Sequence, residues 1–172
     1  YSYRGFKALT AQREGAAVDL TGAVSHWDLG PLQLRGRTFA LEVGSQVEVL
    51  GGDLVSNAPE LARLTLNVAR VHHDASAADG RRLVYGGHTI GIALGQVARA
   101  LPQVVTVLGW EGCDHVGPVH EGDTLRSTVE VVEVRGDRAD VRVRVAGDVA
   151  ADSDPDPRPV LDWRFTALVT GS

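Results

Sequence analysis

The chain has 172 residues, of which 44% are hydrophobic, and it carries a formal net charge of −5. This length suffices for one well-buried core, so we expect a single domain rather than two. The acidic balance and the absence of Lys- or Arg-rich runs argue against nucleic acid as the main partner, because binding the phosphate backbone requires clustered positive charge.

The first 38 residues show little hydrophobic rhythm, and we interpret 1–38 as an N-terminal arm or a leading pair of strands. The main domain is expected over 39–172. Loose alternation over 39–49 predicts an entry strand that Gly51 and Gly52 close.

A short helix is predicted next, leading to Asn67. Asn57 precedes a proline-containing first turn, and Leu61, Leu64 and Val68 are apolar at helical spacing.

The strongest helical pattern covers 88–101, directly after Gly86 and Gly87, and Pro102 ends it. Many of its side chains are small: Gly91, Ala93, Gly95, Ala98 and Ala100. Small side chains predict that this helix lies close to a sheet that wraps it, and this packing offsets the cost of internal glycines.

Alternating apolar residues predict four further strands, over 104–110, 127–135, 139–146 and 159–170. The Asp- and Pro-rich stretch 152–159 is interpreted as a solvated loop between the last two. The expected architecture is α+β, with one long helix followed by antiparallel strands.

Asn67 and His72 lie five positions apart, upstream of the glycine pair. An imidazole titrates near neutral pH, so His72 is a candidate general acid–base. The amide of Asn67 either orients a water molecule or satisfies backbone groups at a helix end. Backbone N–H groups of Gly86 and Gly87 can receive an oxyanion at a helix N-terminus, and the pair also permits a tight turn.

Neighbouring polar residues have simpler interpretations. His88 lies in the first helical turn and either lines the pocket or caps the helix, where the helix dipole lowers its pKa. His73 points away from His72 and is assigned to solvent or an interface. Asp123 is assigned to a structural turn. Arg70, Arg81 and Arg82 either contact phosphate groups of a ligand or are solvated.

These motifs resemble the MaoC-like acyl-thioester dehydratases, or R-specific enoyl-CoA hydratases, over residues 39–170. The resemblance rests on three elements in order: Asn67 with His72 and then Asp74, the helix entry at 85–88, and the turn at 117–125. It implies a hot-dog fold, in which an antiparallel sheet wraps a long central helix. It also implies a homodimer, or pairing with a second hot-dog domain, that places the active site along the interface.

The resemblance further implies reversible hydration of a 2-enoyl thioester of coenzyme A or acyl carrier protein to a 3-hydroxyacyl thioester. His72 would act as base and acid, Asn67 would position water, and the Gly86–Gly87 backbone would hold the thioester oxygen. The ligand phosphates at Arg70, Arg81 and Arg82 would be those of coenzyme A, with solvated arginines as the alternative. No cofactor is expected, because the thioester itself acidifies the α-carbon. The family usually carries Asp where this chain has Asn67, so the proton work shifts to His72.

Two other functions stay open. In one, the chain is a non-catalytic hot-dog subunit of a heteromeric or double assembly, and Asn67 marks lost chemistry. In the other, it is an acyl-CoA thioesterase, which needs a carboxylate or water-activating residue in the helix, where only Gln96 is available.

Metal and membrane association are not expected. The six histidines lack the spacing of a zinc site, and Cys113 stands alone. Neither a signal-peptide pattern nor an apolar run of membrane-spanning length occurs in the sequence, so we expect a soluble cytoplasmic protein.

Overall fold

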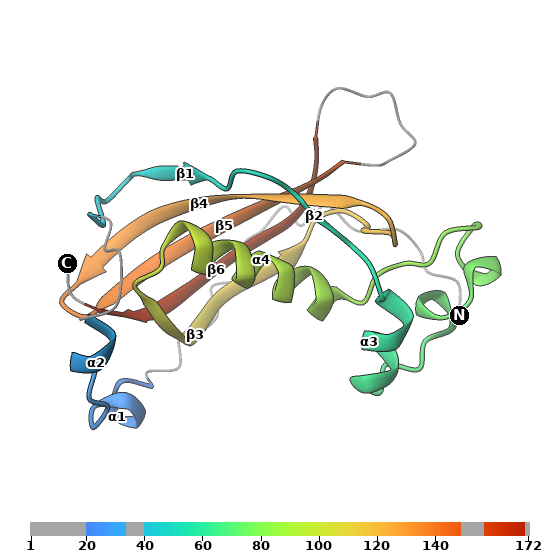
Figure 1. The fold of residues 1–172 in the computed structure, drawn as a ribbon. Coiled ribbons are helices and arrows are strands. Elements are labelled where there is room, and N and C mark those ends of the chain that lie inside the picture. Colours follow the sequence, from blue (N-terminus) through green and yellow to red (C-terminus); the bar gives the residue numbers. More distant parts are fainter. Residues whose placement is uncertain (1–19, 34–39, 149–156, 171–172) are drawn as a thin grey trace.

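The structure, a computed structural model, describes residues 20–33, 40–148 and 157–170. Its main element is an antiparallel sheet in the order β1-β4-β5-β6-β3, with β2 also paired to β4 (Figure 1). The six strands are β1 (Gln46–Glu48), β2 (Asp53–Leu54), β3 (Val104–His115), β4 (Thr124–Arg135), β5 (Arg138–Asp148) and β6 (Arg158–Val169). The four strands predicted after the long helix are confirmed.

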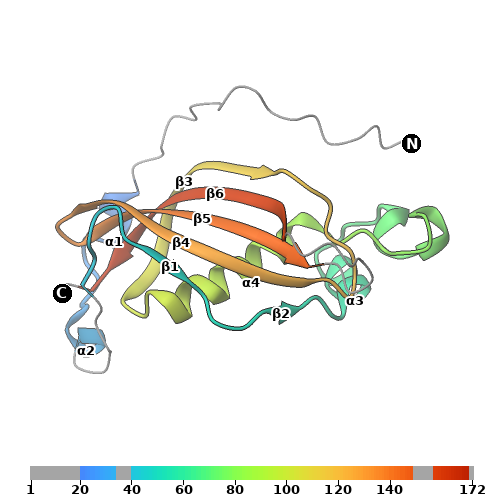
Figure 2. The same cartoon turned by 90° about the horizontal axis from the view of Figure 1, so that it is seen from above.

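Helix α4 (Gly86–Ala100) lies along one face of this sheet, as Figures 1 and 2 both show. It begins two residues before the predicted start, because Gly86 and Gly87 are already helical, and it ends before Pro102. Its buried residues recur at helical spacing and face the sheet: Thr89, Ala93, Gln96 and Val97. The predicted helix across an antiparallel sheet is confirmed.

The small residues of α4 have a different role from the predicted one. Ala93 is fully buried and does allow close packing. Gly91, Gly95 and Ala98 are exposed, and a Cβ added to either glycine would meet nothing within 4 Å. The prediction that these three residues let the helix approach the sheet is wrong, because they lie on its opposite side.

The core fills the space between α4 and the sheet. Val143 of β5 is opposite Trp163 of β6, and Val141 is opposite Phe165, so all four side chains share one face. Each is at most 1% exposed, and the Trp163 and Phe165 rings lie 4.4 Å apart. Residues that alternate with them along the strands point outward and carry charge, as in the Arg142–Asp162 ion pair.

The first strand is shorter than predicted. Of the expected strand over 39–49, only Gln46–Glu48 pairs with β4, and Phe39 lies outside the described residues. Gly44 has φ +84°, a conformation that turns the chain and ends any extended run. Gly51, at φ +79°, makes the turn expected after the strand.

Only part of the predicted N-terminal arm can be compared with the structure. Residues 20–33 contain two single helical turns, α1 (Thr21–Val24) and α2 (Gly30–Gln33), and no strand. The remainder of 1–38 lies outside the described residues, as does most of the loop predicted at 152–159.

Helix α3 (Ala58–Leu64) confirms the helix predicted after Asn57, with Pro59 in its first turn. Its buried residues are Ala58, Pro59 and Ala62. By contrast, Leu64 is 81% exposed and Val68, beyond the helix, is 84% exposed. These two apolar positions therefore contribute little to the core.

Leu66 ends α3 in the left-handed region, at φ +56°. Its N–H donates to the Arg63 carbonyl (3.1 Å), and the N–H of Asn67 donates to the Ala62 carbonyl (2.9 Å). These two bonds form a Schellman motif, whose left-handed position is usually glycine. Any residue with a Cβ loses about 1–2 kcal/mol there.

Leu66→Gly is expected to raise the free energy of unfolding by about 0.5–1 kcal/mol, because relief of the left-handed strain exceeds the entropic cost of glycine. Urea denaturation followed by circular dichroism measures the change. Leu64→Gly is the matched control: this residue is also exposed but helical, so the substitution should lower stability. Equal effects of the two substitutions would contradict the strain argument.

Two short 3-10 turns, η1 (Arg70–His72) and η2 (Ala75–Ala77), connect α3 to α4. The segment from Thr65 to Tyr85, drawn in green, projects past one end of the sheet in both views (Figures 1 and 2). This projecting segment carries Asn67 and His72.

Candidate active site

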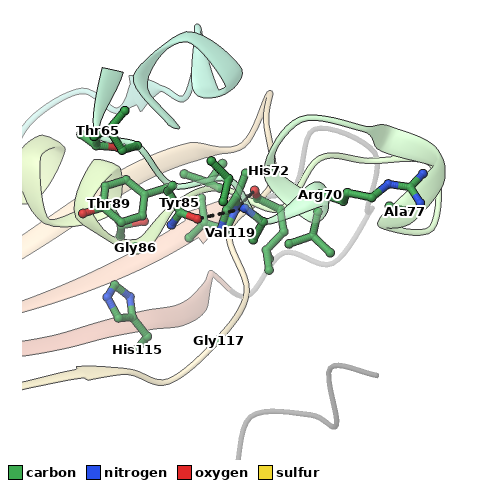
Figure 3. Close-up of a pocket in the computed structure, with 17 residues that line it drawn as sticks. Thr65, Arg70, His72, Ala77, Tyr85, Gly86, Thr89, His115, Gly117 and Val119 are labelled. Atoms are coloured by element: carbon green, nitrogen blue, oxygen red, sulfur yellow. Dashed lines mark hydrogen bonds between the residues drawn. The ribbon is translucent and has the colours of Figure 1, made fainter. Parts of the chain in front are cut away.

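A pocket of about 1060 Å³ lies at the N-terminus of α4. Its wall combines the projecting segment, the first turn of α4 and the residues around the end of β3 (Figure 3). Polar or chemically versatile groups in the lining are Thr65, Asn67, Arg70, His72, Tyr85, Gly86, Thr89 and His115. The fold thus brings four of the predicted site residues, Asn67, Arg70, His72 and Gly86, to one pocket.

His72 closes η1, and its Nδ1 lies 2.7 Å from the carbonyl oxygen of Leu83. A carbonyl oxygen only accepts, so Nδ1 carries the proton and, in the neutral ring, Nε2 carries the lone pair. Nε2 has no hydrogen-bond partner among the described residues. The Tyr85 ring meets the imidazole edge to face, with centroids 6.3 Å apart. His72 is therefore oriented as a proton acceptor.

The structure shows one of the two roles left open for Asn67, the satisfaction of backbone groups at a helix end. Asn67 ends the Schellman motif through its backbone N–H, and its side-chain Oδ1 accepts a bond from Ala69 N–H at 3.3 Å. Its Nδ2 has no acceptor within the described part of the chain and remains able to donate. Asn67 is thus a helix-ending residue whose amide also lines the pocket.

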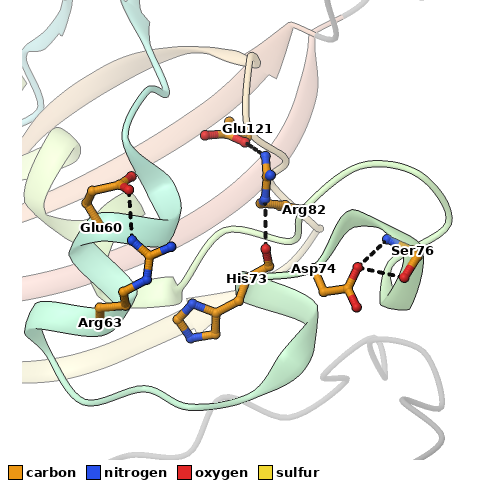
Figure 4. A network of polar contacts seen from close by, with 7 residues as sticks. All are labelled: Glu60, Arg63, His73, Asp74, Ser76, Arg82 and Glu121. Atoms are coloured by element: carbon orange, nitrogen blue, oxygen red, sulfur yellow. Dashed lines mark hydrogen bonds and ion pairs between the residues drawn. The ribbon is translucent and has the colours of Figure 1, made fainter.

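The sequence assigned His73 to solvent or an interface, and the structure shows that its imidazole forms a hydrogen bond within the chain. His73 is half-buried, and its Nε2–H donates to the Asn67 carbonyl oxygen at 2.7 Å. Arg82 Nε in turn donates to the His73 carbonyl at 3.0 Å (Figure 4). The imidazole therefore holds the projecting segment in place, because the chain doubles back on itself there.

Arg81 and Arg82 attach the projecting segment to the turn before β4. Arg81 pairs with Asp123 at 2.5 Å. Arg82 pairs with Glu121 at 2.6 Å, as Figure 4 shows. Asp123 is fully buried and also accepts from His120 N–H, in keeping with its predicted structural role. Neither arginine lines the pocket, so a role in coenzyme A binding remains a prediction for them.

Arg70 does line the pocket, and its side chain is 78% exposed. It pairs with Asp74 at 2.6 Å. Bonds from Ser76 and Arg70 lower the pKa of Asp74 to about 2, so this carboxylate stays charged at neutral pH. Of the three arginines, Arg70 is the one placed to reach a ligand.

The glycine pair divides into two roles. Gly86 lines the pocket, and a Cβ there would lie 2.7 Å from His115 Nε2. Gly87 is outside the lining, and its Cβ would meet the Tyr85 ring at 2.5 Å. Neither N–H has an acceptor in the described chain. The free N–H at the pocket therefore belongs to Gly86.

His88 is outside the pocket lining and does not cap α4, whose N-cap residue is Tyr85. Its Nδ1 is buried without a hydrogen-bond partner. Burial lowers the pKa of His88, whereas the helix dipole was the predicted cause. The predicted cap is absent because the side chain turns into the protein instead of toward the first helical N–H groups.

Thr89 and His115 are pocket residues that the sequence did not predict. Thr89 is 1% exposed and lies three positions after Gly86, so helical spacing could have revealed it. His115 ends β3, five residues beyond the predicted strand end at Trp110. Three register shifts along β3 reset the alternation, so a period of two in the sequence could not have placed His115 on the inner face.

Gln96, considered for thioester hydrolysis, does not reach the pocket. It is fully buried, and its Nε2 donates to Asp53 Oδ2 (2.6 Å) and to the Leu125 carbonyl (2.9 Å). It therefore joins β2, β4 and α4. No residue of α4 in the lining offers a carboxylate.

Three histidines are expected to make stability depend on pH. Burial is the main cause that lowers the pKa values of His88, His115 and His120 below the ordinary 6.5. The unfolded chain then binds protons that the folded protein does not, so stability is full above 6.5 and falls as pH decreases below it. Each histidine adds at most about 1.4 kcal/mol per pH unit to the slope of the free energy of unfolding against pH.

Urea denaturation at pH 7.5, 6.5 and 5.5 measures this loss. His88→Gln should reduce the slope, whereas His26→Gln, at an exposed position, should leave it unchanged. An unaltered slope in His88→Gln would contradict the assignment of buried neutral imidazoles.

Within residues 20–33, 40–148 and 157–170, no three His, Cys, Asp or Glu side chains gather as a metal site would require. In the same part of the chain, no helix has the length and apolar character needed to span a membrane.

No family model matches the chain. Among curated proteins, it is similar to mesaconyl-CoA hydratase of Cereibacter sphaeroides, with 34% identity over 94 residues, which cover 53% of this chain and 27% of the relative. It is also similar to β-methylmalyl-CoA dehydratase of Chloroflexus aurantiacus, with 28% identity over 149 residues, covering 74% and 42%. The chain therefore spans less than half the length of these relatives.

Among solved structures, the chain is similar to a conserved hypothetical protein from Mycobacterium tuberculosis that is essential for bacterial survival during infection and has a double hot-dog fold. Identity is 48%, the TM-score is 0.73, and the match covers 85% of this chain and 46% of the other. A putative MaoC domain dehydratase from Chloroflexus aurantiacus matches with 26% identity, a TM-score of 0.66, and 84% and 47% coverage. These comparisons confirm the predicted hot-dog fold and the predicted resemblance to MaoC-like dehydratases.

Proposed function

We propose that this chain catalyses the reversible hydration of a 2-enoyl thioester of coenzyme A to a 3-hydroxyacyl thioester. The observation that carries the proposal is the orientation of His72. Its Nδ1–H is held by the Leu83 carbonyl, and its Nε2 is left free in a pocket that also contains the Gly86 N–H. The names of the two curated relatives, a CoA hydratase and a CoA dehydratase, support the same reaction class.

In the hydration direction, His72 Nε2 takes a proton from water as the water oxygen bonds to Cβ of the enoyl group. The electrons of the double bond move toward the thioester, giving an enolate. The imidazolium then returns the proton to Cα, which restores His72 and completes the addition of one water molecule. The thioester itself acidifies Cα, so the proposed reaction uses no cofactor.

The enolate oxygen is assigned to the Gly86 N–H, at the start of α4. An N–H at the first helical position has no partner inside the helix, and the helix dipole favours negative charge there. In other enzymes, one such donor is worth about 2.7–4 kcal/mol of transition-state stabilisation. Gly87 is not assigned to this role, because it lies outside the pocket lining.

Asn67 is assigned to the attacking water. With Oδ1 bonded to Ala69, its Nδ2–H₂ is the group available to hold the water oxygen. An amide cannot accept a proton at neutral pH, so His72 performs both proton transfers in this proposal.

Asn67→Asp is expected to retain hydration but to move the acid limb of the kcat/KM pH profile to higher pH. A carboxylate in the pocket stabilises the protonated imidazole of His72, the form that cannot act as the base. The measurement is kcat/KM for crotonyl-CoA between pH 5.5 and 8.5. An unshifted acid limb would contradict the placement of the two side chains in one site.

The proposal also includes a second hot-dog domain as partner, either another copy or a companion domain. Strand β3 ends the sheet order, so one of its edges has no paired strand among the described residues. Trp110 on β3 is 51% exposed, and the chain spans 46% of a solved double hot-dog chain. An open strand edge of this kind favours pairing with another strand.

The test is a crotonyl-CoA hydration assay, followed by loss of enoyl absorbance, on the chain alone and together with candidate partner chains. Branched and long 2-enoyl thioesters extend the test to other acyl groups. Activity on at least one supports the proposal. Complete inactivity in every combination overturns it and favours the alternative in which Asn67 marks a non-catalytic hot dog.

A further inference from the structure

We propose that His115 is a catalytic residue that donates a hydrogen bond to the thioester oxygen of the substrate, beside the Gly86 N–H. This inference rests on the proposed function. The two donors come from different parts of the fold, since Gly86 begins α4 and His115 ends β3.

The sheet register directs His115 toward the helix. His115 pairs with Leu161 of β6, and residues opposite each other in antiparallel strands point to the same face. Leu161 is 1% exposed and belongs to the core between the sheet and α4. His115 therefore lies on the inner face, and it lines the pocket (Figure 3).

The imidazole approaches Gly86 closely. A Cβ at Gly86 would lie 2.7 Å from His115 Nε2 and 3.0 Å from its Cε1, so the ring edge occupies the space that any side chain would take there. Neither ring nitrogen has a hydrogen-bond partner in the described chain. An imidazole nitrogen and a backbone N–H, both without partners, thus lie at the same end of the pocket.

The protonation state suits a donor that keeps its proton. Burial lowers the pKa of His115, and the charge of Asp114 opposes this only in part. A neutral imidazole retains one N–H and can donate it without releasing a proton. His115 therefore differs in role from His72, whose Nε2 accepts.

The alternative is purely steric, with His115 filling the space above Gly86. Three substitutions separate the two explanations. His115→Gln keeps an amide N–H near the position of Nε2, His115→Asn is polar but too short to reach it, and His115→Leu fills space without a donor. Thermal unfolding followed by circular dichroism shows whether each variant is folded.

The first readout is binding of cinnamoyl-CoA, whose absorbance moves to longer wavelength when its carbonyl accepts hydrogen bonds. The second is kcat/KM for crotonyl-CoA. His115→Leu and His115→Asn should lose most of the red shift and about 10²–10³ in kcat/KM, the usual loss for one oxyanion donor. His115→Gln should recover part of both. The control His120→Gln, outside the pocket lining, should keep both.

The outcomes are distinct. If the wild-type protein hydrates crotonyl-CoA and all three variants keep its red shift, or lose activity equally, the donor role is overturned and the proposed function stands. If the wild-type protein neither binds nor hydrates enoyl thioesters, the proposed function fails first. If His115→Leu does not fold, the difference between Gln and Asn decides the question.

Discussion

His72→Asn is expected to lower kcat for crotonyl-CoA hydration by about 10²–10⁴ while the protein stays folded. The amide N–H₂ of Asn can take the place of Nδ1 and donate to the Leu83 carbonyl, so the local structure is retained. No atom replaces Nε2, and the reaction loses the group that takes and returns the proton. The expected loss is the usual worth of general acid–base catalysis.

Two further variants complete this test. His72→Gln places an amide near Nε2 that cannot shuttle a proton, and it should be as impaired as His72→Asn. His88→Gln removes an imidazole outside the pocket lining and should leave kcat within a few-fold of wild type. An active His72→Asn enzyme would remove His72 from the mechanism.

Asp123→Asn is expected to lower the free energy of unfolding by about 3 kcal/mol. Asp123 is fully buried, pairs with Arg81 at 2.5 Å and accepts from the backbone N–H of His120. Removing one charge of a buried pair commonly costs about 3–5 kcal/mol. We expect the lower end, because the Arg81 side chain is 38% exposed and can turn to water.

Glu121→Gln is the matched control, two residues away. Its ion pair with Arg82 is 29% exposed on the Glu side and 37% on the Arg side, and such pairs contribute about 0–1 kcal/mol. Urea denaturation at pH 7.5 compares the two variants. Equal losses of stability would show that burial of Asp123 does not set the strength of the contact.

The sequence predicted the elements whose signal is local and repeated. Alternation at Val141 and Val143 marked the inner face of β5, and the helical spacing before Pro102 marked α4. Burial of alternate side chains produces a period of two in strands, and burial of one face produces a period near 3.6 in helices, so both can be seen in a short window. The predicted N-terminal arm or strand pair had no such repeated signal, and the alternation over 39–49 was only loose.

Part of the site could be predicted for the same reason. Asn67, His72 and Gly86 are close in sequence, and their order was sufficient to place them at one helix entry. The short-range signal could not show that Gly86 lines the pocket and Gly87 does not, nor that His73 bonds to the Asn67 carbonyl. Both outcomes depend on how the projecting segment folds back.

Other contacts of the site and of the projecting segment depend on pairing between distant parts of the chain. His115 meets Gly86 only because β3 pairs with β6 and α4 crosses the same face, and Arg81 meets Asp123 only because the projecting segment folds against the turn before β4. The exposure of Gly91 depends likewise on which side of α4 the sheet covers. By itself, the sequence determined the long helix and the strands that follow it, because local periodicity records burial within one element. It also brought Asn67 and His72 close to Gly86, because these residues are near one another along the chain. Only the tertiary structure decided which groups share the pocket, because strand register and helix orientation are set by contacts between elements.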